Sequence, residues 1–400
     1  MKNIRLFDND LEYYNATLDY PNVAYISSID KVIMKDTDPS TEKSEYLNFK
    51  AVGGDATIEM PNSGQTYFGL SYSFDKNTWT NWNYSAITIP NGSTVYFKGD
   101  NPNGMNKGQY SGFRCFKMTG KVEAHGNIQS LLWNDDFENN LTIPKDYCFF
   151  GLFSGCTSLT SAPQLPATTL TQYCYQYMFR NCTSLTTAPQ LPATTITQGC
   201  YSNMFNGCTS LTTAPALPAT TMVSSCYEGM FRNCTSLKYA PSLPAMVSAM
   251  YCYRNMFNGC TSLTIAPELP ITTLTGNYCY GYMFAGCTSL TSAPQLPATT
   301  LTDLCYDNMF NGCTSLTSAP ELPATTLAQQ CYGQMFENCS NLNYVKAMFT
   351  STPSTDRWSG QVYNWLNGVA SSGTFVKNSE ATWTTSGVIP NGWTVQTASE

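Results

Sequence analysis

The residues whose type and spacing first suggest chemistry are 16 of the 17 cysteines. They form two series, and each member of the first series precedes a member of the second by eight residues. The first series is Cys148, Cys174, Cys200, Cys226, Cys252, Cys279, Cys305 and Cys331. The second series is Cys156, Cys182, Cys208, Cys234, Cys260, Cys287, Cys313 and Cys339. Paired thiols suit zinc ligation or disulfide formation, and either requires a defined geometry.

The possible roles of the cysteine pairs differ in the geometry that they need. Zinc knuckles place their ligands about two to four residues apart, whereas these pairs are wider and the chain has a single histidine, His125. A disulfide within a pair would span about 12 Å if the segment is helical, beyond the ~7 Å limit between bridged Cα atoms. Like cysteines of stacked units would lie about 5 Å apart, but an unbroken row cannot pair every member twice. We therefore expect reduced, small apolar core residues, with disulfides and zinc as the alternatives.

Few other residues suggest catalysis. His125 lies in an alternating segment typical of a strand, which favours a structural role. Asp135, Asp136 and Glu138 offer oxygen ligands for calcium, but they lack the spacing and the glycine of an EF-hand, which favours a solvated turn. The sequence has no phosphate-binding loop, nucleophile elbow or zinc-protease motif. We therefore predict a protein that is not an enzyme and has no catalytic residues, no cofactor and no metal site.

The composition argues against two classes of partner. Charged residues make up 12% of the chain and the net charge is −7, so the chain lacks the basic face that nucleic-acid binding needs. No run approaches the roughly 18 apolar residues of a membrane span. The first residues lack the apolar core of a secretory signal, which favours a protein that reaches its place without the secretory route.

A repeated unit fills the middle of the chain. Both cysteine series recur every 26 residues, with one step of 27 between Cys260 and Cys287. The unit reads C-Y-x-x-M-F-x-G/N-C-T-S-L-T-x-A-P-x-L-P-A-T-T-L-T-x-x. This period is typical of solenoids, in which each unit buries its apolar face against the next.

Each unit contains a predicted helix and a predicted strand. A short helix ending at a left-handed Asn or Gly is indicated by apolar residues four positions apart, such as Leu170, Cys174, Met178 and Cys182. Residues 185–191 predict a short parallel strand, because the prolines there limit ladder pairing.

Alternating apolar and polar residues precede the repeats. The alternating segments, separated by turn sequences, predict an antiparallel β-sandwich and span residues 46–60, 67–74, 94–98 and 113–132. Within them, SFDKNTWTNW resembles the Asp-box hairpin, with Ser73, Asp75, Thr78 and Trp79 at the positions of the motif. That resemblance implies a fixed turn without catalysis.

The sequence thus predicts a mainly β fold with short helices, in four parts. These are an N-terminal attachment segment and linker (1–45), a β-sandwich domain (46–142), a repeat solenoid of about eight 26-residue coils (143–345) and a small α/β C-terminal cap (346–400). In the cap, residues 356–370 predict a helix, and GTFVK and GWTVQ predict strands.

Positions that vary between the repeats are the candidates for ligand binding. Variation gathers at the two residues after Cys-Tyr, at the residue after Met-Phe and between Ala-Pro and Leu-Pro. Rows of aromatic and amide side chains on the outside of a stack suit a sugar or a protein surface, although exposed positions also drift without function. The candidate ligand-binding residues of the repeats are Gln164, Gln176, Tyr177, Gln190, Asn203, Arg254, Asn255, Glu268, Tyr282, Gln295, Asp307, Asn308 and Glu321.

Aromatic residues of the predicted β-sandwich are a second candidate site. Trp79, Trp82 and Tyr84 lie close enough in sequence to form a platform for carbohydrate. The alternation of a strand also predicts that one or two of the three belong to the core.

The repeat resembles the leucine-rich repeats called BspA-like. In the family's order A-F-x-x-C-x-x-L, Met178 and Phe179 occupy the A-F pair, Cys182 the cysteine and Leu185 the leucine. The resemblance covers about half of the chain, near residues 144–345, and the unit here has one extra residue in its strand region. The phrase CTSLTxAPxLPATTL is similar to proteins encoded by Bacteroidales and their crAss-like phages.

This resemblance implies a phage structural protein, a head or tail fibre on the virion surface that is assembled in the host cytoplasm and binds a host-surface glycan or protein. It also implies contacts with other virion proteins through the N-terminal segment and, by analogy with fibres, a homo-oligomer such as a trimer. The alternative is a bacterial cell-surface adhesin of the BspA-like type. A depolymerase would need paired carboxylates, and the repeats offer scattered ones such as Glu228, Glu268 and Glu321.

Overall fold

The computed structural model describes residues 23–26, 31–34, 45–61, 69–106, 115–383 and 387–398. The chain divides into two compact units, Met1–Glu45 and Tyr46–Glu400. In the first unit, β1 (Val23–Ile26) and β2 (Lys31–Met34) form an antiparallel pair. The rest of the predicted attachment segment lies outside the described residues.

Two sheets open the second unit. Their strands are β3 (Leu47–Ala51), β4 (Ala56–Glu59), β5 (Leu70–Ser73), β6 (Thr80–Asn81), β7 (Ile87–Ile89), β8 (Thr94–Gly99), β9 (Lys117–Thr119), β10 (Val122–His125) and β11 (Leu159–Ser161). The larger sheet has the order β11-β10-β3-β8-β5-β6, and the smaller has the order β7-β4-β9. Inward-facing Phe49, Phe97 and Phe116 lie in one buried cluster, as the alternating sequence predicts. The expected strands are therefore confirmed where the chain is described.

The first repeat is joined directly to the larger sheet. Its β11 pairs in parallel with β10, with Leu159 opposite Val122. Between these strands lie α2 (Ser130–Trp133) and the 3-10 helix η1 (Asn134–Asp136), the only helices among the described residues. The Ser130 hydroxyl donates to the carbonyl of Phe97 at 2.9 Å and fastens α2 to the sheet. The fold is thus mainly β.

The Cys-Tyr-x-x-Met-Phe segment of each repeat is a run of turns and not a helix. Phe179 donates its backbone N–H to the carbonyl of Met204 in the next copy, at 2.9 Å. Its neighbour Met178 donates to Tyr175, three residues earlier in the same copy, at 3.1 Å. This alternation recurs in all eight copies, so every second N–H links one coil to the next. The predicted helix is wrong, because an α-helix would direct all of these donors to carbonyls within the same copy.

A left-handed residue at every fourth position produces these turns. The φ angles of Tyr173, Tyr177 and Asn181 are 56°, 58° and 58°, and the same three positions are left-handed in all eight copies. The four-residue spacing also places the apolar side chains of the segment on its inner side, which explains why the sequence imitates a helical stripe. The third left-handed position holds only Asn or Gly, the residues that adopt this conformation at least cost: Gly155, Asn181, Gly207, Asn233, Gly259, Gly286, Gly312 and Asn338.

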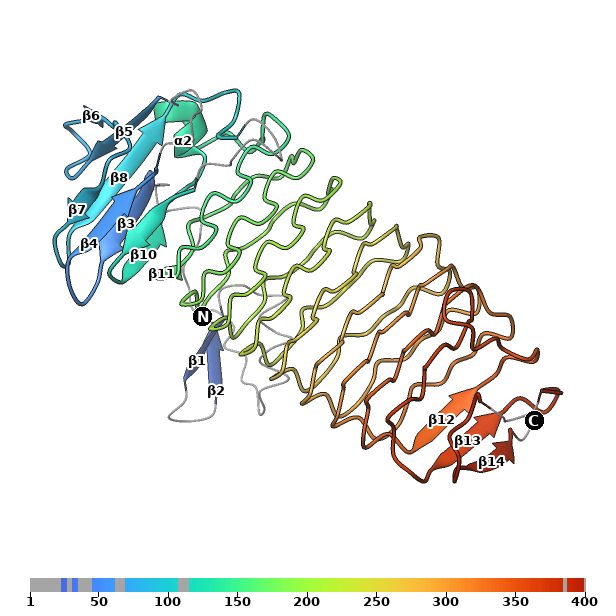
Figure 1. The fold of residues 1–400 in the computed structure, drawn as a ribbon. Coiled ribbons are helices and arrows are strands. Elements are labelled where there is room, and N and C mark those ends of the chain that lie inside the picture. Colours follow the sequence, from blue (N-terminus) through green and yellow to red (C-terminus); the bar gives the residue numbers. More distant parts are fainter. Residues whose placement is uncertain are drawn as a thin grey trace. The chain divides into compact units, whose positions relative to one another are not determined.

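Equivalent side chains stack on one another through the repeats. Successive turns of the chain lie side by side in Figure 1, and we call this part of the structure the repeat stack. The tyrosines after the first cysteine stack at 5.7 to 6.0 Å between ring centroids from Tyr175 to Tyr332. The phenylalanines after each methionine stack at 5.4 to 5.8 Å from Phe153 to Phe336. Each coil therefore buries its rings only with a neighbour on both sides.

The predicted parallel strand is present in reduced form. After β11, most copies pair through isolated parallel bridges, such as Thr187 with Thr213, since the prolines nearby have no N–H to donate. Threonine hydroxyls add further links: Thr186 Oγ1 donates to the carbonyl of Thr160 at 3.1 Å, one copy earlier.

The C-terminal segment continues the pattern of the repeats. The strands expected in GTFVK and GWTVQ are confirmed as β13 (Thr374–Lys377) and β14 (Thr394–Thr397), which join β12 (Tyr344–Ala347) in a parallel sheet. The helix expected over 356–370 is wrong. Residues 361–367 instead accept hydrogen bonds from the eighth copy, and Asn364 and Gly368 are left-handed, four residues apart.

Substitutions at Asn233 test the left-handed positions. We expect Asn233→Gly to leave stability nearly unchanged, because other copies hold Gly there, and Asn233→Val to cost about 1–2 kcal/mol, because a β-branched side chain clashes at positive φ. Unfolding midpoints of the full chain measure both effects. Arg232→Val, at an exposed neighbour without positive φ, is the matched control, and a cost as large as that of Asn233→Val would contradict the assignment.

Candidate functional site

The cysteines are core residues with a specific packing role. All 17 thiols are free, and all except Cys115 are buried. In the second series, each Sγ donates to the carbonyl of a phenylalanine, as Cys208 does to Phe179 of the preceding coil at 3.0 Å. A serine would fit the same space, but a thiol supplies a weak donor with an apolar surface. The interpretation as small apolar core residues is confirmed by this burial.

Burial also makes these thiols poor nucleophiles and poor metal ligands. It raises the pKa of Cys208 and of Cys260 to about 12, since a thiolate there would lose its hydration. The thiols therefore stay neutral at physiological pH.

The row between Ala-Pro and Leu-Pro lies on the outside, as expected. The side chains of Gln164, Gln190, Glu268, Gln295 and Glu321 are all exposed. Of these, Glu321 forms an ion pair with Lys346 at 3.0 Å. This row offers mostly amides to a partner.

The row after Cys-Tyr differs from the expectation of an outer surface. Gln176, Asp307 and Asn308 are buried, with 6%, 8% and 4% exposed. Side chains here lie between neighbouring coils, which cover them. The second position of the row is also left-handed, with φ of 55° at Asn308, so the asparagines found there satisfy the backbone as well as any ligand. Half-buried members of this row are Tyr177, Asn203, Arg254, Asn255 and Tyr282.

The expected carbohydrate platform of the N-terminal sheets is not available. Trp82 and Tyr84 are 5% and 4% exposed, and Trp82 Nε1 donates to the carbonyl of Ser85 at 2.9 Å. Both rings belong to the core, because these two residues, two positions apart just after β6, direct their side chains inward. The proposal of Trp82 as a ligand-binding residue is therefore wrong.

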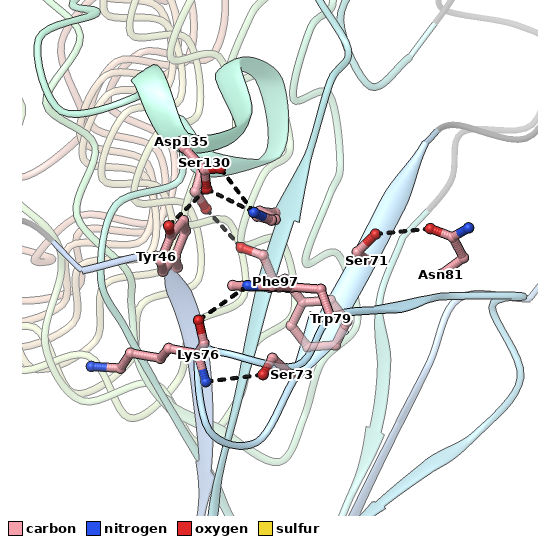
Figure 2. Close-up of polar contacts among 10 residues, drawn as sticks. Tyr46, Ser71, Ser73, Lys76, Trp79, Asn81, Phe97, Ser130 and Asp135 are labelled. Carbon is pink, nitrogen blue, oxygen red and sulfur yellow. Dashed lines mark hydrogen bonds and ion pairs between the residues drawn. The ribbon is translucent and has the colours of Figure 1, made fainter.

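Trp79 is part of a structural clasp, shown in Figure 2. Lys98 Nζ lies 4.5 Å from the centroid of the indole ring, and the edge of Tyr46 contacts the same ring with centroids 5.0 Å apart. Asp135 connects the lysine and the tyrosine, because its carboxylate accepts hydrogen bonds from Lys98 Nζ at 2.7 Å and from the Tyr46 hydroxyl at 2.7 Å. The acidic patch suggested as a calcium site thus uses one carboxylate for this ion pair, and the lysine lowers the pKa of Asp135.

The Asp-box segment forms the expected turn. Asp75 Oδ1 accepts the backbone N–H groups of Asn77 and Thr78 at 2.8 and 2.7 Å. His125, the lone imidazole, is exposed at the end of β10 with Glu123 Oε2 3.5 Å from its Nε2. Neither site gathers a nucleophile and a base.

One region of the repeat stack departs from the consensus in several ways at once. Where other copies have Thr-Thr, the fourth copy has Met246 and Val247, which are 62% and 50% exposed. Met250, 46% exposed, occupies a position that is polar in the other copies with this motif. Comparison of variable rows missed these residues, although the change from Ala-Thr-Thr to Ala-Met-Val is visible in the sequence.

The single 27-residue repeat has its extra residue at the same place. Alignment of the copies identifies Gly276 as the insertion. A Cβ there would overlap the backbone of Ala249 and Met250, so only glycine permits this close packing. The irregular spacing and the exposed apolar side chains therefore belong to one structural feature.

Arg254, four residues after Met250, lies between two aromatic rings. Its guanidinium carbon is 5.3 Å from the ring centroid of Tyr251 and 5.1 Å from that of Tyr278, one coil further on. Nη1 lies 3.5 Å from Glu228 Oε1, and a third of the arginine side chain is exposed. Stacking on two tyrosines fixes the guanidinium while leaving part of it open to a partner.

The next two coils add a half-buried tyrosine and a buried carboxyl group. Gly281 occupies the position equivalent to Arg254, and Asp307 follows it in the next coil. Burial raises the pKa of Asp307 to about 6, while the hydrogen bond from Asn308 and the charge of Arg254 act against this rise. Burial and the nearby Asp307 also raise the pKa of Tyr282. A carboxyl group without a close cation is a costly feature in a scaffold.

We call the resulting surface the irregular patch. Its members are Met246, Val247, Met250, Tyr251, Arg254, Tyr278 and Tyr282. Tyrosine and arginine dominate binding energy at interfaces, and methionine adapts to irregular partner surfaces. Of the residues predicted from sequence, Arg254, Tyr282 and Asp307 lie close enough to influence one another's charge, and Asn308 donates to Asp307. Gln176 and Tyr177 lie three copies earlier than Arg254. The arrangement is suited to binding.

Two searches of the described residues bear on other kinds of site. No group of three or more His, Cys, Asp or Glu side chains in them is arranged to hold a metal ion. Within the same residues, no helix has the length and apolar character needed to cross a bilayer.

Comparison with known proteins gives one match. The family model described as BspA type leucine-rich repeat region, with six copies, matches residues 127–264 and 253–354. Together these ranges cover residues 127–354, more than half of the 400 residues. No curated protein and no solved structure matches the chain.

Alkylation tests the assignment of the thiols. With iodoacetamide at pH about 8, we expect the 16 repeat cysteines to stay unmodified in the folded protein and Cys115, which is half-buried, to react slowly. All 17 should react after denaturation. Peptide mass spectrometry measures the modification, and rapid labelling of any repeat cysteine in the folded chain would refute the assignment.

The pH dependence of stability tests the environment of Asp307. Its folded pKa of about 6 exceeds the ordinary 3.8, so the native state binds the proton more tightly and stability falls as pH rises from about 4 to about 6. Over this range the wild type should lose about 2 to 3 kcal/mol relative to Asp307→Asn. Urea unfolding of both proteins at several pH values measures this, and parallel profiles would show that the carboxyl group is not perturbed.

Proposed function

The chain belongs to the BspA-type leucine-rich repeat family, and from this we propose that it is a non-enzymatic surface-binding protein whose irregular patch contacts a host-surface protein or glycan. Repeats of this family suggest surface adhesion or binding. The observation that carries the proposal is the exposure of Met246, Val247 and Met250, which shortly precede Tyr251 and the stacked Arg254 in the chain. Elsewhere the equivalent positions hold threonine or other polar residues, which makes the patch a clear departure from the surface of the other copies.

The chemistry of the other titratable groups supports a role without catalysis. The repeat thiols are buried and neutral, and Asp135 is engaged by Lys98. The carboxylates of Glu228 and Glu321 lie beside Arg254 and Lys346, so neither stands as part of an acid and base pair.

For its biological setting we propose a phage virion fibre, on the head or the tail. The leucine-rich-repeat solenoid, flanked by a β-sandwich and a C-terminal cap of strands and turns, would display the patch, and residues 1–45 would attach the protein to other virion proteins. Assembly in the host cytoplasm as a homo-oligomer, such as a trimer, agrees with the reduced thiols. The alternative is a bacterial cell-surface adhesin, which the family match supports equally.

Virion composition separates these two settings. Imaging and peptide mass spectrometry of purified particles should detect the chain at a fixed copy number per virion. Its absence from virions, together with its presence in a bacterial envelope fraction, would favour the adhesin.

Binding by the patch is tested with the full chain. The protein should bind host cells and compete with phage adsorption, and Arg254→Ala or Tyr278→Ala should weaken binding about 10-fold or more, because central tyrosines and arginines carry most of the energy of an interface. Arg232→Ala, at an exposed arginine that belongs neither to the patch nor to the candidate ligand-binding residues, is the control and should bind normally. Equal binding by all three variants, with unchanged melting temperatures, would rule out the patch as the binding site.

A further inference from the structure

The last coil leaves a row of backbone donors without acceptors. In the eighth copy, Gln334, Phe336 and Asn338 donate their N–H groups to the carbonyls of residues 363, 365 and 367, at 2.7, 2.9 and 2.7 Å. By the same register, the donors of the following coil belong to residues 364, 366 and 368. None of these three N–H groups finds an acceptor within the described part of the chain.

The backbone geometry of these three donors is the same as that of the donors in the earlier coils, which bond to the next coil. They lie two residues apart, and the residues at both ends of the row are left-handed, with φ of 49° at Asn364 and 74° at Gly368. Leu366, the middle residue, is 5% exposed, whereas Asn364 and Gly368 at the two ends are exposed. A donor in a buried position such as that of Leu366 is unfavourable unless an acceptor reaches it.

A cavity of about 560 Å³ lies over this row. Its lining contains no charged side chain and consists of Thr355, Val362, Asn364, Trp365, Leu366, Asn367, Gly368, Val369, Ala370, Ser371, Gly387, Val388, Ile389, Pro390 and Asn391. Beyond this coil, β14 continues the sheet on the strand side only. Of the described residues between β13 and β14, residues 387–391 line the cavity, and none of their carbonyls accepts from the three donors.

We propose that this cavity binds a peptide segment of another protein, which takes the conformation of a turn segment and pairs its carbonyls with the N–H groups of Asn364, Leu366 and Gly368. Donors on alternate residues match carbonyls on alternate residues, as the eight pairings between coils show. Trp365, which ends the ring ladder at 6.4 Å from Tyr332, is 1% exposed, so the peptide pairs through its backbone and does not extend the ladder. This site goes beyond the proposed surface binding and does not depend on it.

A second copy of the repeat stack does not meet these requirements. Another C-terminal end would present the same donors and no acceptors. The opposite end of the stack has its carbonyls occupied: Met105 and Phe116 donate to Cys148 and Leu152 at 3.0 and 2.8 Å. An anion is also disfavoured, because no cationic side chain lines the cavity.

Amide exchange tests the first part of this inference. In the full chain, the amides of Asn364, Leu366 and Gly368 should exchange about 100-fold faster than those of Gln334, Phe336 and Asn338, which are bonded to the next coil. Site-resolved hydrogen exchange measures both sets. Equal protection of the two sets would overturn the inference, because it would mean that the donors already have an acceptor within the chain.

A peptide probe tests the second part. The probe is a synthetic peptide with the sequence of residues 329–340, QQCYGQMFENCS, which carries the turn segment of the last complete copy, and a scrambled peptide is its control. It should bind the full chain and slow exchange at the three amides. Ser371→Trp, which fills the cavity, should weaken binding at least tenfold, whereas Ser372→Trp, an exposed neighbour outside the lining, should not. Failure to bind, or equal binding by both variants, would overturn the proposal.

Discussion

The alternation of backbone N–H groups between the same coil and the next coil is the constraint on which the repeat stack depends. It requires a left-handed residue at every fourth position, such as Tyr173, Tyr177 and Asn181, and this explains both the Asn and Gly of the motif and its four-residue apolar spacing. Once the backbone is linked in this way, equivalent residues must lie above one another. Rings then stack on rings, and the cysteines are small enough to fill the space below them while donating to a carbonyl. Conservation between copies therefore records packing.

The same constraint separates scaffold from site. Positions that are the same in every copy support the stacking of the coils. Some variable positions also have a backbone role: Asn203 and Asn308 have positive φ angles, which asparagine adopts readily. A binding surface is indicated where a side chain differs from its equivalents in other copies and the difference does not serve the backbone conformation or the packing. Met246, Val247 and Met250 are exposed and apolar, and the backbone of Met250 packs against the inserted Gly276. Arg254, four residues after Met250, is stacked between two tyrosines. The C-terminal end of the repeat stack differs from the other coils in its backbone, because the N–H groups of residues 364, 366 and 368 have no acceptor among the described residues.

Much of this fold can be predicted from the sequence, and the exceptions have physical causes. The 26-residue period, the burial of the cysteines, the strands of the N-terminal sheets and the Asp75 turn follow from spacing and residue type. The helix predicted in each repeat is wrong, because apolar residues spaced four apart are compatible both with an α-helix and with turns that have a left-handed residue at every fourth position. The site was predicted only in part. Arg254, Tyr282, Asp307 and Asn308 were found by comparing variable positions, whereas Met246 was missed because it departs from a row that is otherwise constant. Trp82 was misassigned, since alternation alone does not tell which phase faces inward.

The most direct test of the alternating ladder is the scalar coupling that nuclear magnetic resonance detects across a hydrogen bond, measured on deuterated full-length protein. The account predicts that the amide nitrogen of Phe231 couples to the carbonyl carbon of Met256, in the next coil, and that Met230 couples to Tyr227, three residues earlier. Coupling of Phe231 to the carbonyl of Tyr227, four residues earlier in the same copy, would indicate an α-helix and contradict the account.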